Sequence, residues 1–367
     1  MYGSTGIGDV TPLAHLILAL FGENMKPIRG ETLPLIAQSS VTTARAAFAI
    51  NDLHILLDEF VALAALDVEA FEANPSPYHP ILGKFRRFLG YQHALCKIRH
   101  CLQGSSLLNA SFKQRHLQSP LSFRCLAVVL GNAFDCLTFC EKQVNLELNA
   151  HQQNPLVLHE EETMIPCAHF DMQNLATTMD FARIALAPVL TTQVERSIKL
   201  LQASQTGLTD GLEPFGYKGG CGLSEISFPL QALLAESKAL IAPVSAEVGS
   251  SMVAEGIEDR MTMASLAAER LQKMVDLSFM IASLSAVISC QAIDLREGKH
   301  TFGENVRTLR KCIRDLIPMM GPDDSPPSSL AKLVSKLKSG FLSKSINLNG
   351  LKCSMNIEDQ LDIKSVL

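Results

Sequence analysis

The sequence predicts a mostly α-helical bundle, and three observations support this fold class. Segments 174–201 and 264–295 carry apolar residues three and four positions apart, the period of a helix with one wide buried face. The chain is 47% hydrophobic but only 6% aromatic and has no Trp, which suits Leu- and Ala-packed helices better than a sandwich or barrel. Helices this long bury their apolar faces against other long helices, so we expect the rest to pack around these two.

Charge and cysteine content exclude several function classes. The formal net charge of −5 predicts neither a nucleic-acid partner nor a membrane partner. Residues 1–20 lack the basic start of a signal peptide and include Asp9. The uncharged stretch 277–293 approaches the length of a membrane span, but its four serines and Gln291 predict a buried helix instead. Ten cysteines without framework spacing indicate a reduced, cytoplasmic protein.

In the first third of the chain, the pattern predicts three helical segments separated by breaks. A glycine-rich lead-in at 3–8 precedes a helix over 11–20, where Thr-Pro supplies the cap and the first helical residue. Such glycines can cradle a phosphate, but no Lys follows them as in a P-loop. A second helix covers 35–68 and ends at the Asn-Pro-Ser-Pro sequence of 74–77. The basic segment 84–100 predicts a solvated helix face.

The rest of the chain predicts further helices and a distinct C-terminal part. The expected helices are 123–149, 174–201 with a kink at Pro188, 227–240 and 264–295. Polar residues 109–119 and glycine-containing residues 207–222 predict loops. We expect residues 1–320 to form the helical core and residues 321–367 to form a Pro/Ser linker and a variable tail. Residues 330–342 of that tail predict a short, basic, amphipathic helix.

Two groups of metal-ligand residue types were weighed, and no metal site is predicted. Cys136 and Cys140 lie four residues apart on one helix, but no further ligand lies at suitable spacing, so they are expected to be core residues. Three histidines and three glutamates lie close in sequence, at His151, His159, His169 and 160–162. Their spacing matches no helix-face pair of metal ligands, so a solvated acidic loop is expected.

Six short motifs follow one another along the chain: GDVTPLAH at 8–15, SPLSFRC at 119–125, NA and NPLV within 149–157, ESKAL at 236–240, ED at 258–259 and DLR at 294–296. In this order they resemble the motifs of the aromatic amino-acid ammonia-lyases, the family of histidine and phenylalanine ammonia-lyase. The first is similar to the family's Gly-Asp-Leu-x-Pro-Leu motif, and the second to its Asp-Pro-Tyr-Ser-x-Arg-Cys motif. The resemblance covers roughly residues 3 to 300 and is closest to histidine ammonia-lyase.

The resemblance implies a fold, a reaction and an assembly. It implies a mostly α, long-helix bundle of the ammonia-lyase type that assembles as a homotetramer, with each active site built from three subunits. It implies elimination of ammonia from an aromatic α-amino acid to give an arylacrylate, histidine to urocanate being the expected case. The family's electrophile is a methylidene-imidazolone that forms autocatalytically from an internal Ala-Ser-Gly, so no free cofactor is expected.

Four residues match the family's substrate-binding positions. Arg124 stands where the family's arginine pairs with the substrate carboxylate, a role that suits a guanidinium fork. Gln118 and Phe170 also match pocket positions. Glu258, the one candidate catalytic residue, stands where histidine-specific members carry an acid that could hold an imidazole. The structural alternatives are a surface or interface arginine at 124 and a helix-start acid at 258.

The electrophile motif itself is degraded in this sequence. The family's Ala-Ser-Gly position reads Gly6-Ile7-Gly8, and Ile7 has no hydroxyl that could be eliminated to give the methylidene. Ser4-Thr5-Gly6 has a hydroxyl before a glycine but is out of register with Asp9. Further family positions are changed, at Ala37, Leu121, Asp171 and Ile257.

The chain also begins at the electrophile loop, so we expect an N-terminally truncated member without the family's catalytic Tyr. Two hypotheses follow. The protein is either a histidine-type ammonia-lyase or a non-catalytic descendant or gene fragment that serves as a helical assembly or ligand-binding protein. An aminomutase would need the same electrophile as the lyase. As written, the chain is expected to carry no prosthetic group, because Ile7 has no hydroxyl to lose. Losing the electrophile and the base together should remove nearly all catalytic rate, because the two act as a unit in such enzymes.

Overall fold

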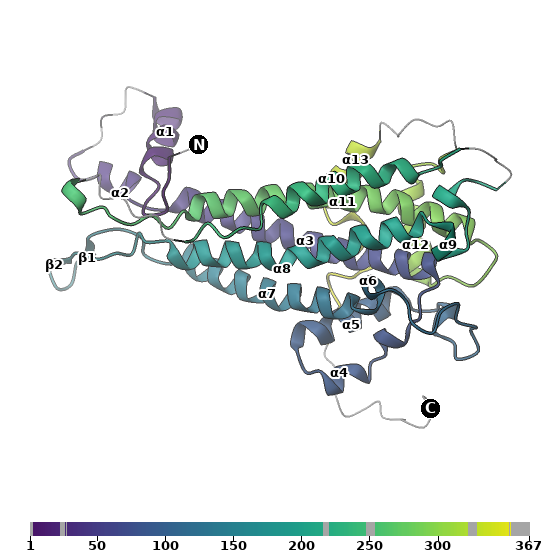
Figure 1. Ribbon diagram of the computed structural model, residues 1–367. Helices are drawn as coiled ribbons and strands as arrows, with labels where there is room; N and C mark the ends of the chain where they lie inside the picture. Colours follow the sequence, from purple (N-terminus) through teal and green to yellow (C-terminus); the bar gives the residue numbers. More distant parts are fainter. Residues whose placement is uncertain are drawn as a thin grey trace. The chain divides into compact units, whose positions relative to one another are not determined.

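The computed structural model describes residues 3–22, 26, 28–215, 220–246, 254–321, 329–351 and 353 (Figure 1). These residues form α-helices and one short antiparallel hairpin, as the mostly α prediction requires. The chain divides into two compact units. Unit 1 comprises residues 1–53, 136–187 and 237–276, and unit 2 comprises residues 54–135, 188–236 and 277–367.

Four helices exceed twenty residues, and the apolar period predicted each of them. They are α3 (Ser40–Phe71), α7 (Leu126–Leu148), α8 (Gln173–Leu200) and α11 (Ala264–Leu295). The bounds of α11 are those that the period predicts, and α8 continues through Pro188. The shorter helices are α1 (Val10–Phe21), α2 (Thr32–Ile36), α4 (Leu82–Phe85), α5 (Leu89–Cys101), α6 (Leu121–Arg124), α9 (Ala203–Thr206), α10 (Ser227–Ala239), α12 (Glu304–Arg314), α13 (Leu330–Lys338) and α14 (Phe341–Ser345).

Two expected helices begin or break at different residues. The expected helix over 35–68 begins only at Ser40, because residues 37–39 leave helical geometry and the carbonyl of Gln38 accepts the Asp9 amide at 2.7 Å. The basic segment 84–100 is split between α4 and α5. The Asp135 carboxylate accepts the Gly90 amide at 2.7 Å and so satisfies a free donor in the first turn of α5.

In unit 1, a buried arginine ties α8 to the segment that follows α10. Arg183 donates to the carbonyl oxygens of Leu240 and Ala267, both at 2.8 Å, and pairs with Asp180. Asp180 accepts the backbone amides of Val244 and Ser245 at 2.9 and 2.8 Å. Because both ions are buried, each needs this full set of partners.

In unit 2, the second half of α3 carries buried carboxylates. Asp67 accepts from Arg196 Nε at 2.8 Å, from Gln193 Nε2 at 3.0 Å and from Ser289 Oγ. All four side chains are buried. This network joins α3, α8 and α11 within the unit, so one carboxylate satisfies donors on two other helices.

A second buried cluster in unit 2 surrounds His300. Its Nε2 lies 2.9 Å from Glu69 Oε2, and its Nδ1 lies 3.5 Å from Glu72 Oε1. Glu72 also pairs with Arg296 at 3.0 Å. Burial alone lowers the pKa of His300, but hydrogen bonds and charges from the two glutamates outweigh it and raise the pKa to about 9.

The helix α11 is long and apolar enough to span a membrane by length and composition. However, 83% of its most apolar stretch is buried inside the protein. The four serines of its uncharged stretch 277–293 are also buried, and two of them hydrogen-bond across the core: Ser289 donates to Asp67, and Ser285 accepts from Ser197. The buried helix expected from those polar residues is therefore confirmed for α11.

The C-terminal part contains two short helices where one amphipathic helix over 330–342 was expected. The carboxylate of Glu59, on α3, accepts the amides of Leu342 and Ser343 at 3.2 and 2.8 Å and so holds the start of α14. The linker residues 322–328 and the end of the tail, residues 354–367, lie outside the described residues, and the division at 320/321 remains a prediction.

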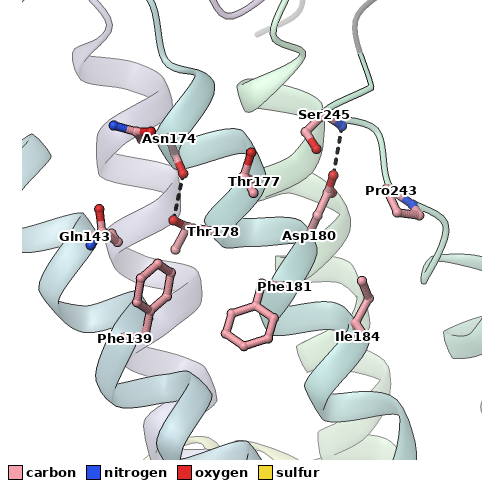
Figure 2. A pocket seen from close by; sticks show the side chains of 10 residues that line it. All are labelled: Phe139, Gln143, Asn174, Thr177, Thr178, Asp180, Phe181, Ile184, Pro243 and Ser245. Carbon is pink, nitrogen blue, oxygen red and sulfur yellow. Dashed lines mark hydrogen bonds between the residues drawn. The ribbon is translucent and has the colours of Figure 1, made fainter.

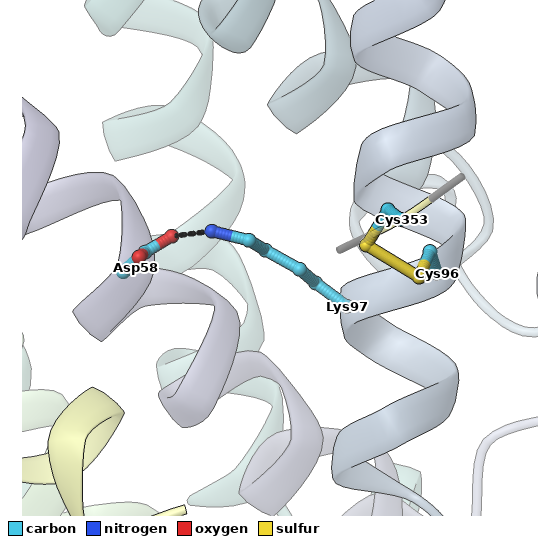
Figure 3. Close-up of a disulfide and its surroundings, with 4 residues drawn as sticks. All are labelled: Asp58, Cys96, Lys97 and Cys353. Carbon is cyan, nitrogen blue, oxygen red and sulfur yellow. Dashed lines mark hydrogen bonds and ion pairs between the residues drawn. A yellow bond between two sulfur atoms is a disulfide. The ribbon is translucent and has the colours of Figure 1, made fainter. Parts of the chain in front are cut away.

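Cysteine pairing differs from the sequence expectation of reduced thiols. Cys96 on α5 forms a disulfide with Cys353, and the neighbouring Lys97 pairs with the buried Asp58 of α3 (Figure 3). The other eight cysteines are free. Sequence spacing gave no signal for this bond because its two cysteines are 257 positions apart.

Candidate functional site

The glycine-rich loop before α1 is held by hydrogen bonds to its backbone carbonyls. The Gly6 carbonyl accepts Thr262 Oγ1 at 2.7 Å and the Met172 amide at 3.1 Å, and the Thr5 carbonyl accepts the Met263 amide at 2.8 Å. Ile7 forms an isolated antiparallel bridge with Asp171. Two distant segments of unit 1, residues 171–172 and 262–263, therefore fix the electrophile-motif position without using the side chain of Ile7.

Gly6 is required for this loop geometry. Its φ of +83° lies in the region that favours glycine. A Cβ at this position would lie 1.9 Å from Thr262 Oγ1 and 2.7 Å from the Ala264 amide. The alanine of the family's Ala-Ser-Gly therefore has no room here in this conformation. Gly8 has a φ of +100° but open space around it.

Asp9 links the loop to the start of α3. It precedes α1, is fully buried, and its two carboxylate oxygens accept Thr42 Oγ1 at 2.6 Å and the Thr42 amide at 2.7 Å. The amide lies in the first turn of α3, where a carboxylate is favoured by free N–H donors and by the helix dipole. The Gly-Asp pair of the first motif thus has a structural role.

Two of the sequence-predicted pocket residues flank this loop in unit 1. Phe170 is half-buried, and its carbonyl lies 3.4 Å from Ser39 Oγ. The next residue, Asp171, pairs with Arg260 at 3.2 Å. Glu258 is exposed and lies just before the segment that carries Thr262. The structure therefore brings the segments of Phe170 and Glu258 to the electrophile-motif loop through backbone contacts of 171–172 and 262–263.

The other two, Arg124 and Gln118, belong to unit 2. Gln118 is exposed, whereas Arg124 is half-buried at the end of α6. The backbone of α6 is fixed, since Ser122 O accepts Arg196 Nη1 at 3.1 Å and Phe123 O accepts the buried Tyr78 hydroxyl at 2.8 Å. The Nε of Arg124 is covered and has no hydrogen-bond partner among the described residues. A buried donor of this kind is suited to an anionic ligand group.

The residue types that could bind a metal gather in two places. Cys136 and Cys140 are buried on α7 with their sulfurs 3.8 Å apart. Residues 160–162 lie, exposed, in the turn between β1 (Leu156–Leu158) and β2 (Thr163–Ile165). No cluster of three or more His, Cys, Asp or Glu suited to a metal occurs in the part of the chain that the structure describes.

An open groove of about 510 Å³ lies elsewhere in unit 1. Figure 2 shows Phe139 of α7 beside Phe181 and Ile184 of α8, with Asp180 and Ser245 at one end. The two phenylalanine rings meet edge to face at 5.8 Å. All three apolar side chains are exposed. The groove contains none of the sequence-predicted site residues.

Sequence reasoning missed the residues that hold the loop. Thr262 donates to a backbone carbonyl, and Thr42 donates to Asp9 from a helix start. Neither residue stands in a motif, and a bond to a backbone carbonyl leaves no pattern in side-chain types. Only Asp9 carried a signal, as the second residue of the GDVTPLAH motif.

Comparisons with known sequences point to the same family as the motifs. The sequence profile of the aromatic amino acid lyases matches residues 23–315. Histidine ammonia-lyase 1 of Fusobacterium nucleatum is 27% identical over 348 residues, which cover 88% of this chain and 66% of the relative. Histidine ammonia-lyase of Stigmatella aurantiaca is 27% identical over 364 residues, 93% of this chain and 70% of the relative. The chain thus spans about two thirds of the length of the curated relatives it matches.

Solved structures share the fold. Ergothionase of Treponema denticola, an ergothioneine-degrading enzyme, superposes with a TM-score of 0.84 at 25% identity, over 93% of this chain and 72% of that chain. Histidine ammonia-lyase of Trypanosoma cruzi also gives a TM-score of 0.84, at 21% identity, over 100% of this chain and 74% of that chain. The bundle of the ammonia-lyase type predicted from the motifs is confirmed.

Proposed function

Because the chain belongs to the aromatic amino acid lyase family, we propose that it eliminates ammonia from an aromatic α-amino acid. The names of the relatives support histidine as the substrate and urocanate as the product. In this elimination the bond from Cα to the amino nitrogen breaks, a proton leaves Cβ, and a carbon–carbon double bond forms. The family match over residues 23–315 is the observation that carries the proposal.

The proposal gives each retained site residue a role. The unpaired Nε of Arg124 supports binding of the substrate carboxylate through charge-assisted hydrogen bonds. The exposed carboxylate of Glu258 would accept a hydrogen bond from an imidazole, and the half-buried ring of Phe170 would pack against it. Gln118 would supply a further polar contact.

The residues at 6–8 do not fit the family's prosthetic group. Methylidene formation removes a hydroxyl from the central residue, and Ile7 has only carbon there. Gly6 has no room for a Cβ. We therefore derive no step through that group. Ser4 and Thr5 are the nearest hydroxyl-bearing residues, and Ser4 Oγ accepts the Gly6 amide at 3.3 Å.

Ile7 favours a second candidate function. In this candidate the protein is a non-catalytic family member that binds an aromatic amino acid or its arylacrylate, or acts in assembly. It keeps the backbone-held loop and the free Arg124 but has no electrophile for the amino group. The two candidates thus differ in one chemical requirement, a hydroxyl that can be lost near Gly6.

One experiment separates the two candidates. The purified chain is incubated with histidine while urocanate absorbance and ammonia are followed, and its intact mass is measured. The lyase proposal requires urocanate, ammonia and a mass lower by two waters in the peptide that spans residues 1–15. The second candidate requires an unaltered mass and no ammonia, with calorimetric binding of histidine or urocanate. In either case Arg124→Ala should weaken ligand binding by about 10- to 100-fold, the effect of losing a charged hydrogen bond.

Assembly and location complete the proposal. We propose a homotetramer, because Phe139, Phe181 and Ile184 leave an apolar groove exposed on unit 1. Light scattering on the unaltered chain and on Phe181→Ser would test it, and a monomer at micromolar concentration would contradict it. We also propose a cytoplasmic protein, since eight of the ten cysteines are free, although the Cys96–Cys353 disulfide is unusual for that compartment; fractionation of expressing cells would test the location.

A further inference from the structure

Acidic residues are absent from one long stretch of this acidic protein. Residues 73–134 contain no Asp or Glu but eight Lys or Arg, whereas the whole chain has a formal net charge of −5. Some of these cations have internal partners: Lys97 pairs with Asp58, and Arg115 lies 3.7 Å from Glu72. Lys84, Arg86 and Arg87 form no ion pair with any carboxylate among the described residues.

The same three cations share a short segment with three exposed apolar side chains. Residues 84–89, named here the basic-aromatic ridge, connect α4 to α5 in unit 2. Phe85 is 84% exposed, Phe88 60% and Leu89 78%. Exposed apolar residues are common singly, but three within five positions form a contiguous patch that favours an occupant.

The ridge is fixed in place by the residues around it. Gly83 O accepts Gln92 Nε2 at 2.9 Å, and Gly90 donates to Asp135 at 2.7 Å. Gly90 also lies so close to α7 that a Cβ would come within 2.1 Å of the Gly131 carbonyl. Arg86 lies over the ring of Phe88, 5.2 Å from its centroid. A surface ordered in this way binds with a smaller loss of entropy than a loose loop.

Lys84 of the ridge has no partner for its ammonium group, which suggests that the occupant of the ridge supplies an acid. The Nζ of Lys84 is covered by protein and forms no hydrogen bond among the described residues. A covered ammonium without a partner is costly, and a carboxylate is the group that best offsets that cost. The occupant of the ridge should therefore be acidic as well as apolar.

The C-terminal residues of this chain have that chemistry. Residues 354–367, which lie outside the described residues, contain Glu358, Asp359 and Asp362 with a single Lys. Ile357, Leu361 and Ile363 are interleaved with these acids. The tail thus complements the ridge in both charge and apolar character.

The position of Cys353 places this tail within reach of the ridge. Cys353 is bonded to Cys96, and Leu89 lies seven residues earlier on the same helix, about 10 Å along its axis. Fourteen residues can span up to about 45 Å when extended. We propose that the acidic tail, residues 354–367, docks on the basic-aromatic ridge of its own chain.

The test compares the unaltered chain with a chain that ends at Cys353 and with charge-reversal variants. The variants are Arg86→Glu with Arg87→Glu, Glu358→Lys with Asp359→Lys, and all four changes together. The readout is the rate of chymotrypsin cleavage after Phe85 and Phe88, relative to cleavage after the exposed Phe215. Circular dichroism confirms that each variant retains its helices.

Docking predicts that tail removal and either double reversal each raise cleavage of the ridge on the order of tenfold, because attractive pairs are lost or become repulsive. The fourfold variant restores opposite charges and should regain the protection of the unaltered chain. Lys142→Glu with Lys311→Glu makes the same charge change at exposed positions outside the ridge and should not alter its cleavage.

Three outcomes would overturn the proposal. Equal cleavage of the full and shortened chains would show that the tail does not cover the ridge. Protection that increases with protein concentration would assign the ridge to a second copy. Failure of the fourfold variant to regain protection would show that charge complementarity does not hold the tail there.

Discussion

The two units hold their candidate functional residues by different physical means. In unit 1 the electrophile-motif loop is fixed through backbone carbonyls, those of Thr5 and Gly6. In unit 2 the backbone of α6, which carries Arg124, is fixed by the guanidinium of Arg196, itself bound to the buried Asp67. A loop held by its backbone tolerates a changed side chain, so its conformation should not depend on the side chain at position 7. A buried charge network tolerates no such change, because each ion left unpaired is costly.

The largest expected effect is in unit 2, on removal of one buried charge. Asp67→Ala leaves Arg196 buried without its carboxylate and should reduce the free energy of unfolding by about 3–5 kcal/mol, measured by urea denaturation. Lys199→Ala breaks the partly exposed pair with Glu195 and serves as the matched control, with an expected loss below about 1 kcal/mol. Equal losses of unfolding free energy in the two variants would mean that burial does not make the Asp67 network more costly to break than the partly exposed pair.

The His300 cluster should make the stability of unit 2 depend on pH. Its pKa is raised to about 9 from an ordinary 6.5, so its stabilisation is fully present below pH 6.5 and is lost as pH rises through 9. The loss should be on the order of 2–3 kcal/mol of unfolding free energy. Denaturation midpoints measured between pH 6 and pH 10 would show it. His300→Gln does not titrate and should flatten that slope, whereas an unchanged slope would assign the loss to other groups.

A smaller effect is expected in unit 1, where the destabilising cause is a steric clash and not an unpaired buried charge. Gly6→Ala places a Cβ against Thr262 Oγ1 on a backbone with positive φ and should cost about 1–3 kcal/mol of unfolding free energy. Gly350→Ala is the control, because no atom lies within 4 Å of that added Cβ. Thermal denaturation of both variants would measure the difference, and an unaffected Gly6→Ala protein would mean that the loop relaxes easily.

The smallest effect is expected at Ile7, and it tests whether the conformation of the electrophile-motif loop depends on that side chain. Ile7→Ser removes a half-buried apolar group but none of the backbone contacts of the loop, so unfolding free energy should change by less than about 1.5 kcal/mol. A loss as large as that of Asp67→Ala, seen in the same urea experiment, would show that Ile7 is part of the core and not a bystander.

These contrasts also explain which features the sequence could predict. The bounds of α11 followed from its apolar period, since burial on one face leaves a regular pattern. The break before α5 did not, because the carboxylate that satisfies its first turn comes from Asp135, 45 residues later. The candidate site shows the same division: motifs predicted Arg124 and Glu258 as site residues, which stay predictions, whereas the contact of Thr262 with a carbonyl left no pattern. The helix α12, short and strongly amphipathic, was overlooked beside the longer apolar runs.

The bond between Cys96 and Cys353 has a topological consequence. It turns most of the chain into a closed covalent ring, since its two ends are 257 positions apart. One proteolytic cut anywhere within the ring would open it without releasing a fragment, and the nicked protein would separate into pieces only under reducing conditions. The ring also cannot close until Cys353 has been synthesised, so helices α1 to α14 are all made before the bond that joins the two ends of the ring can form.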